Sequence, residues 1–201
     1  MKSRRRSGTI RGLAKVGTRR KPDGSTVGDI LSTLGDRSFG WGFVLAGALN
    51  MLPLPPGSNM ALGLPALFVA LQMAWGQPTL WLPAFIRSRS IARTHWRGAA
   101  LGALPIAKPL SRITHMRMTW MFEGSSERLL GILFVLVAVN LVLPIPFSGW
   151  VPAIAIFVVG LGLVEHDGLI VMLGAAIGIF SLFLSVAVVL AFYFGFNYVI
   201  E

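Results

Sequence analysis

The sequence contains no cysteine and few charged residues. Without thiols the chain cannot form disulfides, thiolate metal sites or cysteine nucleophiles. Charged residues make up only 13% of the 201 residues, whereas soluble domains carry about 25%. The hydrophobic content of 54% and the mean hydropathy of +0.71 therefore indicate a chain built for an apolar solvent. It is long enough for several membrane segments of ~20 residues each.

Basic residues are missing from the C-terminal part of the chain. All 18 Lys and Arg residues lie at or before Arg128, and the last 73 residues contain none. This asymmetry is typical of a positive-inside topology. The net charge of +10 does not predict nucleic-acid binding, because no basic surface is interleaved with the aromatic residues that such a site needs.

Residues 1–37 are predicted to form a basic, flexible cytoplasmic tail. Nine basic residues lie within the first 21, mixed with Gly and Ser. No apolar core follows them, so a signal peptide is not expected. The tail fixes the topology, docks onto anionic lipid headgroups, or does both.

Residues 38–201 are predicted to form a single membrane domain in which proline interrupts two apolar runs. The interruptions are "NMLPLPPGSNMALGLP" at 50–65 and "NLVLPIPFSGWVP" at 140–152. Proline lacks the N–H that a helix needs and clashes with the preceding turn. We therefore predict helical hairpins over 39–76 and 129–164, joined by a basic cytoplasmic connection over 87–128, with Ser38 capping the first helix.

The two interrupted runs repeat the same order of features. An asparagine precedes a Pro-x-Pro tip in each, and a Pro-Ala pair opens each downstream limb. This pattern predicts an internal duplication of the kind that many transporters show, with chance similarity between two apolar segments as the alternative.

Residues 168–200 contain no charge over 33 positions. This length exceeds one crossing and falls short of two. We predict one long, tilted transmembrane helix, with a kink or break near residues 174–178 as the alternative. The expected fold class is an all-α membrane protein with two Pro-x-Pro-broken hairpins and a long C-terminal helix.

No enzyme signature accompanies this pattern. The three histidines lack metal-ligand spacing, and no nucleophile elbow, phosphate loop or pair of intramembrane carboxylates is present. His166 lies between Glu165 and Asp167, where a hydrophilic turn closed by Asp-Gly accounts for the cluster. We expect no catalytic residue, metal site or cofactor.

Uncharged polar residues within the apolar runs are the main candidates for a site. They serve either as interhelical hydrogen-bond partners, worth ~0.6 kcal/mol each, or as the lining of a substrate site. Lipid cannot satisfy backbone groups that a hairpin tip frees, so we expect the tips near Pro55 and Pro146 to pack together around a polar cavity. Helix N-termini there would favour an anion. The candidate substrate-binding residues are Asn50, Pro53, Pro55, Ser58, Asn59, Gln72, Asn140, Pro144, Pro146 and Ser148.

Three arginines spaced by four residues form one stripe on a helix. They are Arg89, Arg93 and Arg97. The stripe is either a positive-inside anchor or a contact for a lipid phosphate, which the guanidinium fork suits.

The paired motifs resemble those of the ExoD family of bacterial exopolysaccharide-synthesis membrane proteins, over about residues 28–195. The first block of that family has Leu-Pro-x-Pro, a small-residue turn, a Leu-rich limb and "LQ" before Gly. It is matched here by Pro53, Pro55, Leu71, Gln72 and Gly76. The second block, "LPIPF…P…GLGLxxxDG", is matched by residues 143–147, Pro152, 160–163, Asp167 and Gly168.

This resemblance implies a protein of the bacterial inner membrane with a role in exopolysaccharide synthesis or export. The apolar segments and the positive-inside rule predict that it crosses the membrane several times and has a cytoplasmic N-terminus. The hairpins also look like the re-entrant hairpins of DedA-type proteins, which are implicated in moving polyprenyl-phosphate lipids, although the intramembrane acidic and arginine residues typical there are missing. The leading hypothesis is a carrier or flippase for a lipid-linked or anionic substrate. The alternative is a non-transporting scaffold for a polysaccharide synthase or polymerase. Expected partners are membrane lipids, polyprenyl-phosphate-linked sugars and polysaccharide-synthesis proteins, and not nucleic acid.

Overall fold

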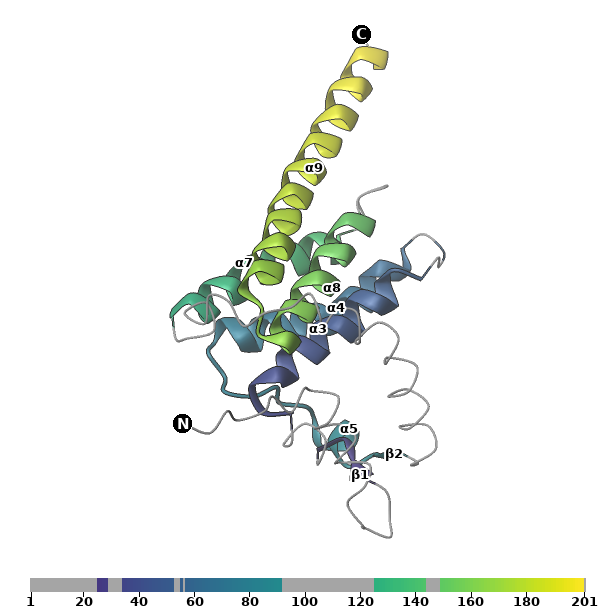
Figure 1. Ribbon diagram of the computed structural model, residues 1–201. Helices are drawn as coiled ribbons and strands as arrows, with labels where there is room; N and C mark the ends of the chain where they lie inside the picture. Colours follow the sequence, from purple (N-terminus) through teal and green to yellow (C-terminus); the bar gives the residue numbers. More distant parts are fainter. Residues whose placement is uncertain are drawn as a thin grey trace.

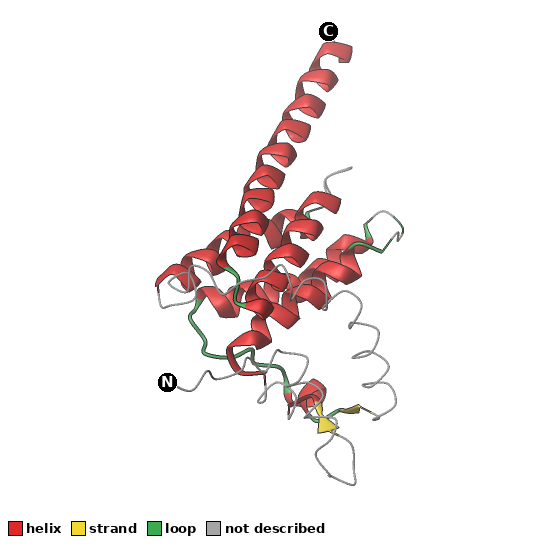
Figure 2. Cartoon of the chain, in the orientation of Figure 1, coloured by secondary structure: helices red, strands yellow, loops and turns green. Residues whose placement is uncertain are grey.

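The computed structural model describes residues 25–28, 34–52, 55, 57–91, 125–143 and 149–200. Within these ranges the fold is helical, apart from two short strands (Figure 2). The five long helices are α3 (Ser38–Asn50), α4 (Ser58–Ala74), α7 (Ser125–Val142), α8 (Trp150–Glu165) and α9 (Gly168–Ile200). The shorter elements are β1 (Ser25–Thr26), η1 (Gly35–Arg37), α5 (Ala84–Arg87) and β2 (Ser90–Ile91), with β1 antiparallel to β2. The all-α prediction is confirmed.

Both proline-containing segments separate two helices. α3 ends at Asn50, and α4 begins after Gly57, whose φ of 92° is a conformation that glycine adopts without strain. α7 ends at Val142 and α8 begins after Gly149. The predicted basic tail up to residue 24, and residues 92–124 of the predicted connection, lie outside the described residues.

The first four long helices form a ring in which each hairpin packs mainly on the other one. α3 packs most extensively on α8, and α4 on α7, while α3 contacts α4 and α7 contacts α8 over smaller areas. Glycine lets the backbones approach. A methyl group added at Gly40 would lie 2.9 Å from the Gly160 carbonyl oxygen, and one added at Gly131 would lie 2.7 Å from the Ala74 Cα. Small residues at helix contacts are the usual means of close packing within membranes.

The core lies between the four helices. Phe43 of α3 and Phe134 of α7 are fully buried, and their ring centroids are 5.7 Å apart at an interplanar angle of 50°. Aliphatic residues from the other two helices, among them Met73 and Ile156, complete this core. The hydrophobic centre is therefore built from both halves of the chain.

Ser38 does not cap α3 as predicted. It is the first residue of the helix, and Arg37 occupies the N-cap position without a side-chain hydrogen bond. The Ser38 hydroxyl oxygen accepts instead from the Leu80 N–H at 2.9 Å, in a buried position. A buried backbone N–H needs a hydrogen-bond partner. The Ser38 hydroxyl serves the Leu80 N–H and therefore does not cap its own helix.

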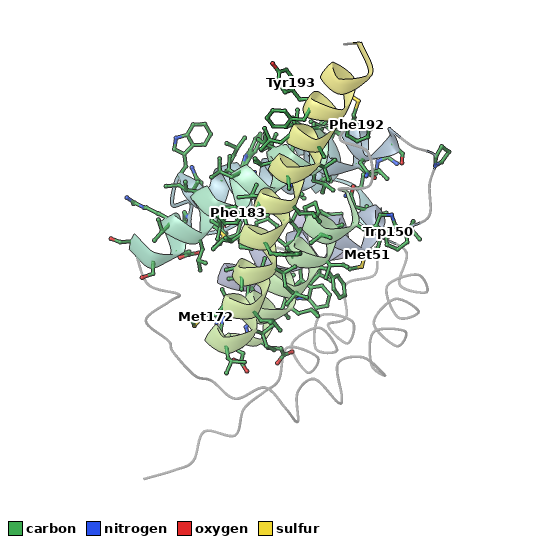
Figure 3. All side chains as sticks on the ribbon, turned by 90° about the horizontal axis from the view of Figure 1, so that it is seen from above. Met51, Trp150, Met172, Phe183, Phe192 and Tyr193 are labelled. Carbon is green, nitrogen blue, oxygen red and sulfur yellow. The ribbon has the colours of Figure 1, made fainter. Side chains whose placement is uncertain are left out.

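α9 is one uninterrupted helix of 33 residues, about 50 Å long at 1.5 Å per residue. The alternative of a break near residues 174–178 is therefore not observed. Its first part packs on the bundle, with Gly174 against Val159 and Gly178 against Val137, and the remainder projects beyond the other helices (Figure 1). Met172, Phe183 and Phe192 follow one another along it in Figure 3.

The turn between α8 and α9 reverses the chain. His166 adopts a left-handed conformation with φ 54°, and the Asp167 N–H donates to the Gly162 carbonyl at 2.9 Å. The Asp167 carboxylate then accepts from the Leu169 N–H at 3.0 Å, which satisfies an N-terminal donor of α9. The predicted hydrophilic turn thus fixes the direction of the long helix.

Two of the described helices are long and apolar enough to cross a membrane, namely α7 and residues 168–195 of α9. Only 17% of the most apolar α9 window is buried inside the protein, so α9 is not the core helix of a soluble fold. Large apolar side chains such as Leu129, Ile132 and Phe183 are exposed on the outer surface. These features support association with a membrane.

Candidate substrate site at the hairpin tips

The two ends of the bundle differ in chemistry. We call the base the end where α3 and α7 begin, and the tip end the opposite one, where the two proline-containing segments connect the helices. The described basic residues belong to the base or to the segment that follows α4. They are Arg37, Arg87, Arg89 and Arg128. Figure 3 shows Met51, at the end of α3, and Trp150, at the start of α8, together at the tip end.

Asn50 ties the first hairpin together near its tip. Its side chain is 4% exposed, and its amide nitrogen donates to the Ala46 carbonyl and to the Leu62 carbonyl, both at 2.8 Å. The second bond joins α3 to α4. The Asn50 side-chain oxygen is buried without a hydrogen-bond partner.

Asn59, in the first turn of α4, lies against Gly149, the N-cap of α8. A methyl group added at Gly149 would overlap the Asn59 Nδ2 atom. Neither helix has a side-chain cap at its N-terminus. The N-termini of α4 and α8 are therefore close to each other, and the Asn59 amide lies at this contact.

Asn140 is 5% exposed, and its amide nitrogen has no hydrogen-bond partner. Ser185 of α9 is in the same condition, 4% exposed with an unpartnered hydroxyl. Leaving such a group unsatisfied costs about 1–3 kcal/mol. The Ser181 hydroxyl, one turn earlier in α9, donates instead to the Gly178 carbonyl at 2.7 Å.

Ser185 was missed by the sequence reasoning. The residue interrupts a long uncharged run, as Asn140 does, so the search for polar groups within apolar segments applies to it as well. Serine satisfies itself so often on its own helix that the sequence does not distinguish Ser185 from Ser181. The fold distinguishes them, because the Ser181 hydroxyl has a hydrogen-bond partner and the Ser185 hydroxyl has none.

Gln72 lies at the base, in the last turns of α4. Its side-chain oxygen accepts from the Trp81 N–H at 2.7 Å, and its Nε2 donates to the Trp81 carbonyl at 3.1 Å. Both halves of the amide thus hold the segment that follows α4. The structure separates Gln72 from the residues of the tip end.

The other candidates from the sequence divide into two groups. Pro55 is exposed, Ser58 is half-buried as the first residue of α4, and Arg89 is exposed beside β2. The remaining candidates lie outside the described residues, namely Pro53, Pro144, Pro146, Ser148, Arg93 and Arg97.

Titratable groups gather at the base. Burial raises the pKa of the Glu165 carboxyl above its ordinary value, and the positive charge of Arg37 opposes this shift. Across the described ranges, no three His, Cys, Asp or Glu side chains come together as a metal site would require.

A helical bundle with exposed apolar helices, charged residues gathered at one end and uncharged polar residues at the other is typical of membrane-associated proteins. The chain matches the family described as "Exopolysaccharide synthesis, ExoD" over residues 9–187. It therefore belongs to the ExoD family, and this membership implies involvement in exopolysaccharide synthesis.

Two curated proteins are similar to the chain, and one of them carries the family's name. The chain is 33% identical over 170 residues to an uncharacterized protein of Synechocystis sp., covering 84% of this chain and 79% of that protein. It is 31% identical over 160 residues to Protein ExoD of Rhizobium meliloti, covering 73% of this chain and 62% of that protein. No solved structure matches the chain.

Proposed function

We propose that this protein crosses the bacterial inner membrane several times and carries a lipid-linked or anionic substrate of exopolysaccharide synthesis or export. The base and the N-terminus face the cytoplasm, and the tip end holds the substrate site. The chain acts without catalysing a reaction. Membrane lipids, polyprenyl-phosphate-linked sugars and polysaccharide-synthesis proteins are its partners.

The contact between Asn59 and Gly149 carries the proposal. It brings two helix N-termini without side-chain caps to one place. Each N-terminus bears a partial positive charge of roughly half an electron, which attracts anions. In α4 the Ser58 and Met60 N–H groups already donate to the Pro55 and Gly57 carbonyls, both at 3.1 Å. Asn140, near the end of α7 at this end of the bundle, adds an amide nitrogen without a hydrogen-bond partner. The Asn50 amide nitrogen is not available in the same way, because it already donates to the Ala46 and Leu62 carbonyls. A site of neutral donors binds an anion without the cost of a buried permanent charge.

The distribution of charge supports the orientation. The described arginines belong to the base side, and the last 73 residues contain no basic residue. The positive-inside rule places such an end in the cytoplasm. α3 has 13 residues and α8 has 16, so they are ~20–24 Å long, shorter than the ~30 Å hydrocarbon core. The short lengths of α3 and α8 support re-entrant hairpins, whereas α7 is long enough to cross the membrane.

The helix contacts support an internal duplication of the two hairpins. Phe134 follows Phe43 at the spacing that separates Pro144 from Pro53, and these two phenylalanines pack on each other. Contact between equivalent residues is expected at a two-fold axis.

The glycine contacts obey the same relationship. Gly131 follows Gly40 by the same number of residues as Pro144 follows Pro53. Gly160 follows Met73 by the same number of residues as Pro152 follows Pro65. Gly40 packs on Gly160, and Gly131 packs on the Met73–Ala74 backbone. Both pairings therefore relate one hairpin to the other in the same way.

Reconstitution into liposomes tests the carrier. A fluorescent polyprenyl-phosphate analogue placed in one leaflet should reach the other leaflet faster in the presence of the protein. Asn140→Ala should slow this transfer severalfold at normal abundance. Gln77→Ala is the matched control, because Gln77 is an exposed amide at the base, and it should leave the rate unchanged.

The alternative function is a non-transporting scaffold for a synthase or polymerase. The scaffold hypothesis predicts that the protein does not speed lipid transfer in liposomes. It also predicts that Asn140→Ala impairs exopolysaccharide synthesis only if the variant no longer co-purifies with its partner proteins. Single cysteines in this cysteine-free chain test the orientation. Ser88→Cys should react only from the cytoplasmic side, and its labelling from the periplasm would overturn the topology.

A further inference from the structure

The junction of α7, α8 and α9 at the tip end contains polar groups that the fold does not use. α8 begins where the chain returns from the end of α7, and α9 runs back toward the same end. Gly178 of α9 packs on Val137 of α7. A methyl group added at Gly178 would also lie 3.8 Å from the Ala155 Cβ of α8. The three helices are therefore in mutual contact one to two turns below the junction.

Two polar residues follow this contact along α7 and α9 in the direction of the tip end. Asn140 lies one turn beyond Val137 on α7, and Ser185 lies two turns beyond Gly178 on α9. Both side chains are more than nine-tenths buried, and Asn140 Nδ2 and Ser185 Oγ have no hydrogen-bond partner. An amide N–H₂ group donates only, and a hydroxyl can donate. The junction thus offers donors and lacks acceptors for them.

The N-terminus of α8 adds donors of the same kind. Its N-cap is Gly149, which has no side chain to cap the helix, and position 152 is proline, which has no N–H. The N–H groups of the first turn have no intrahelical partner, and the helix dipole makes this end positive. The Asn59 amide also lies against Gly149.

A shallow apolar groove, largely open to the surroundings, lies on the surface of α9. It has a volume of about 260 Å³ and is lined by Ile179, Leu182, Phe183 and Val186, all of this one helix. Leu182 and Val186 flank Ser185 in the helix. A polar junction with donors next to an apolar groove matches an amphiphile better than it matches a free ion.

We propose that this junction binds the oxyanion headgroup of a lipid, with Asn140 Nδ2, Ser185 Oγ and the first N–H groups of α8 donating to its oxygens. The hydrocarbon chain lies in the groove of α9. Ser185 is thereby assigned as a binding residue. This inference rests on the proposed carrier function and specifies the phosphate-bearing part of the substrate and its location.

Lipid binding to the full chain tests the inference. The protein, purified in an amine-oxide detergent that contains neither phosphate nor sugar, is titrated with dioleoyl phosphatidic acid, and bound lipid is measured by native mass spectrometry. The salt concentration is kept high enough to screen the basic N-terminal segment. Ser185→Ala and Asn140→Ala should each weaken binding about tenfold, the factor that corresponds to ~1.4 kcal/mol.

Ser181→Ala is the matched control. Ser181 is a buried serine one turn from Ser185 on the same helix, and its hydroxyl is already bonded to the Gly178 carbonyl. The control should bind phosphatidic acid as the wild type does, and dioleoylglycerol, which has no phosphate, should bind to none of the proteins. Thermal unfolding of each variant shows whether it is folded, and Ser185→Thr, which keeps the hydroxyl, should restore binding if the alanine variant is unstable.

Several results would overturn the inference. They are equal affinity of Ser185→Ala and the wild type, equal losses in Ser185→Ala and Ser181→Ala, or binding of dioleoylglycerol as tight as that of phosphatidic acid. If inorganic phosphate binds the protein by itself and completely displaces phosphatidic acid, the site is one for a free anion and not for a lipid. If the variants weaken binding but the wild type transfers no lipid in liposomes, this site stands and the carrier function fails. If transfer is intact in Ser185→Ala, the carrier function stands and this site fails.

Discussion

The rings of Phe43 and Phe134 meet in the centre of the bundle, 5.7 Å apart, although 90 residues separate them in the chain. Each comes from the first helix of its hairpin, and both are fully buried. The contact joins α3 to α7, the first helices of the two proline-interrupted segments. The stability of the helical bundle therefore depends on both halves of the chain together.

Truncating either ring should destabilise the protein. Phe43→Ala and Phe134→Ala should each lower the free energy of unfolding by about 3–5 kcal/mol, because each leaves a cavity in the core. The double variant should lose less than the sum, since both rings border one shared space. Unfolding by sodium dodecyl sulfate in mixed micelles measures these changes. Phe183→Ala, which removes a ring that is 71% exposed, should change little, and additive losses in the double variant would contradict the coupling.

The close approach of α3 and α8 predicts a strong effect at Gly160. A methyl group there would lie 2.6 Å from the Val44 backbone nitrogen and 2.9 Å from the Gly40 carbonyl oxygen. Gly160→Ala should force the helices apart and cost about 1–3 kcal/mol, which exceeds the gain of up to ~1 kcal/mol from better helix propensity. Gly195→Ala is the control, because nothing lies within 4 Å of the added methyl group. Equal melting temperatures of the two variants would argue against the backbone contact.

Gln72 should control the order of the segment that follows α4. Gln72→Leu removes both hydrogen bonds to the Trp81 backbone, and each contributes about 0.5–1.5 kcal/mol. Hydrogen exchange of the Trp81 amide should become severalfold to tenfold faster, while lipid transfer in liposomes stays near the wild-type rate. Slow transfer at unchanged exchange would instead indicate a direct role of Gln72 with substrate.

The raised pKa of Glu165 predicts a dependence of stability on pH. Burial raises this pKa above the ordinary value of 4.5, against the opposing effect of Arg37. The folded state therefore binds the proton more tightly than the unfolded state does. The contribution to stability is complete below pH 4.5 and is lost as the pH rises through the raised pKa. Glu165→Gln should flatten this part of the profile and stabilise the protein at neutral pH, measured as the free energy of unfolding against pH. A profile that keeps its slope in the variant would exclude Glu165 as the cause.

The sequence by itself determined the helical elements. Proline and glycine in the segments after Asn50 and Val142 end helices because of backbone sterics, which act within a few residues. The uncharged run from Gly168 determined α9 in the same local way, since nothing in it ends a helix. Membership of the ExoD family was also readable from local motifs and is confirmed by the family match.

Tertiary structure decided how the polar residues are used. Ser38 bonds to Leu80, Gln72 to Trp81, and Asn50 to Leu62. These pairings depend on which helices pack together. In this bundle α3 packs on α8 and α4 on α7, and glycines lie at both contacts.

The same reason explains Ser185. In sequence it is one of two serines spaced by four residues, with the same propensity and the same hydropathy as Ser181. Only the packing of α9 on the bundle buries Ser185 with its hydroxyl unpartnered while Ser181 bonds to its own helix. Hydrogen-bond satisfaction is a property of the three-dimensional surroundings, because a buried donor must find its acceptor in space.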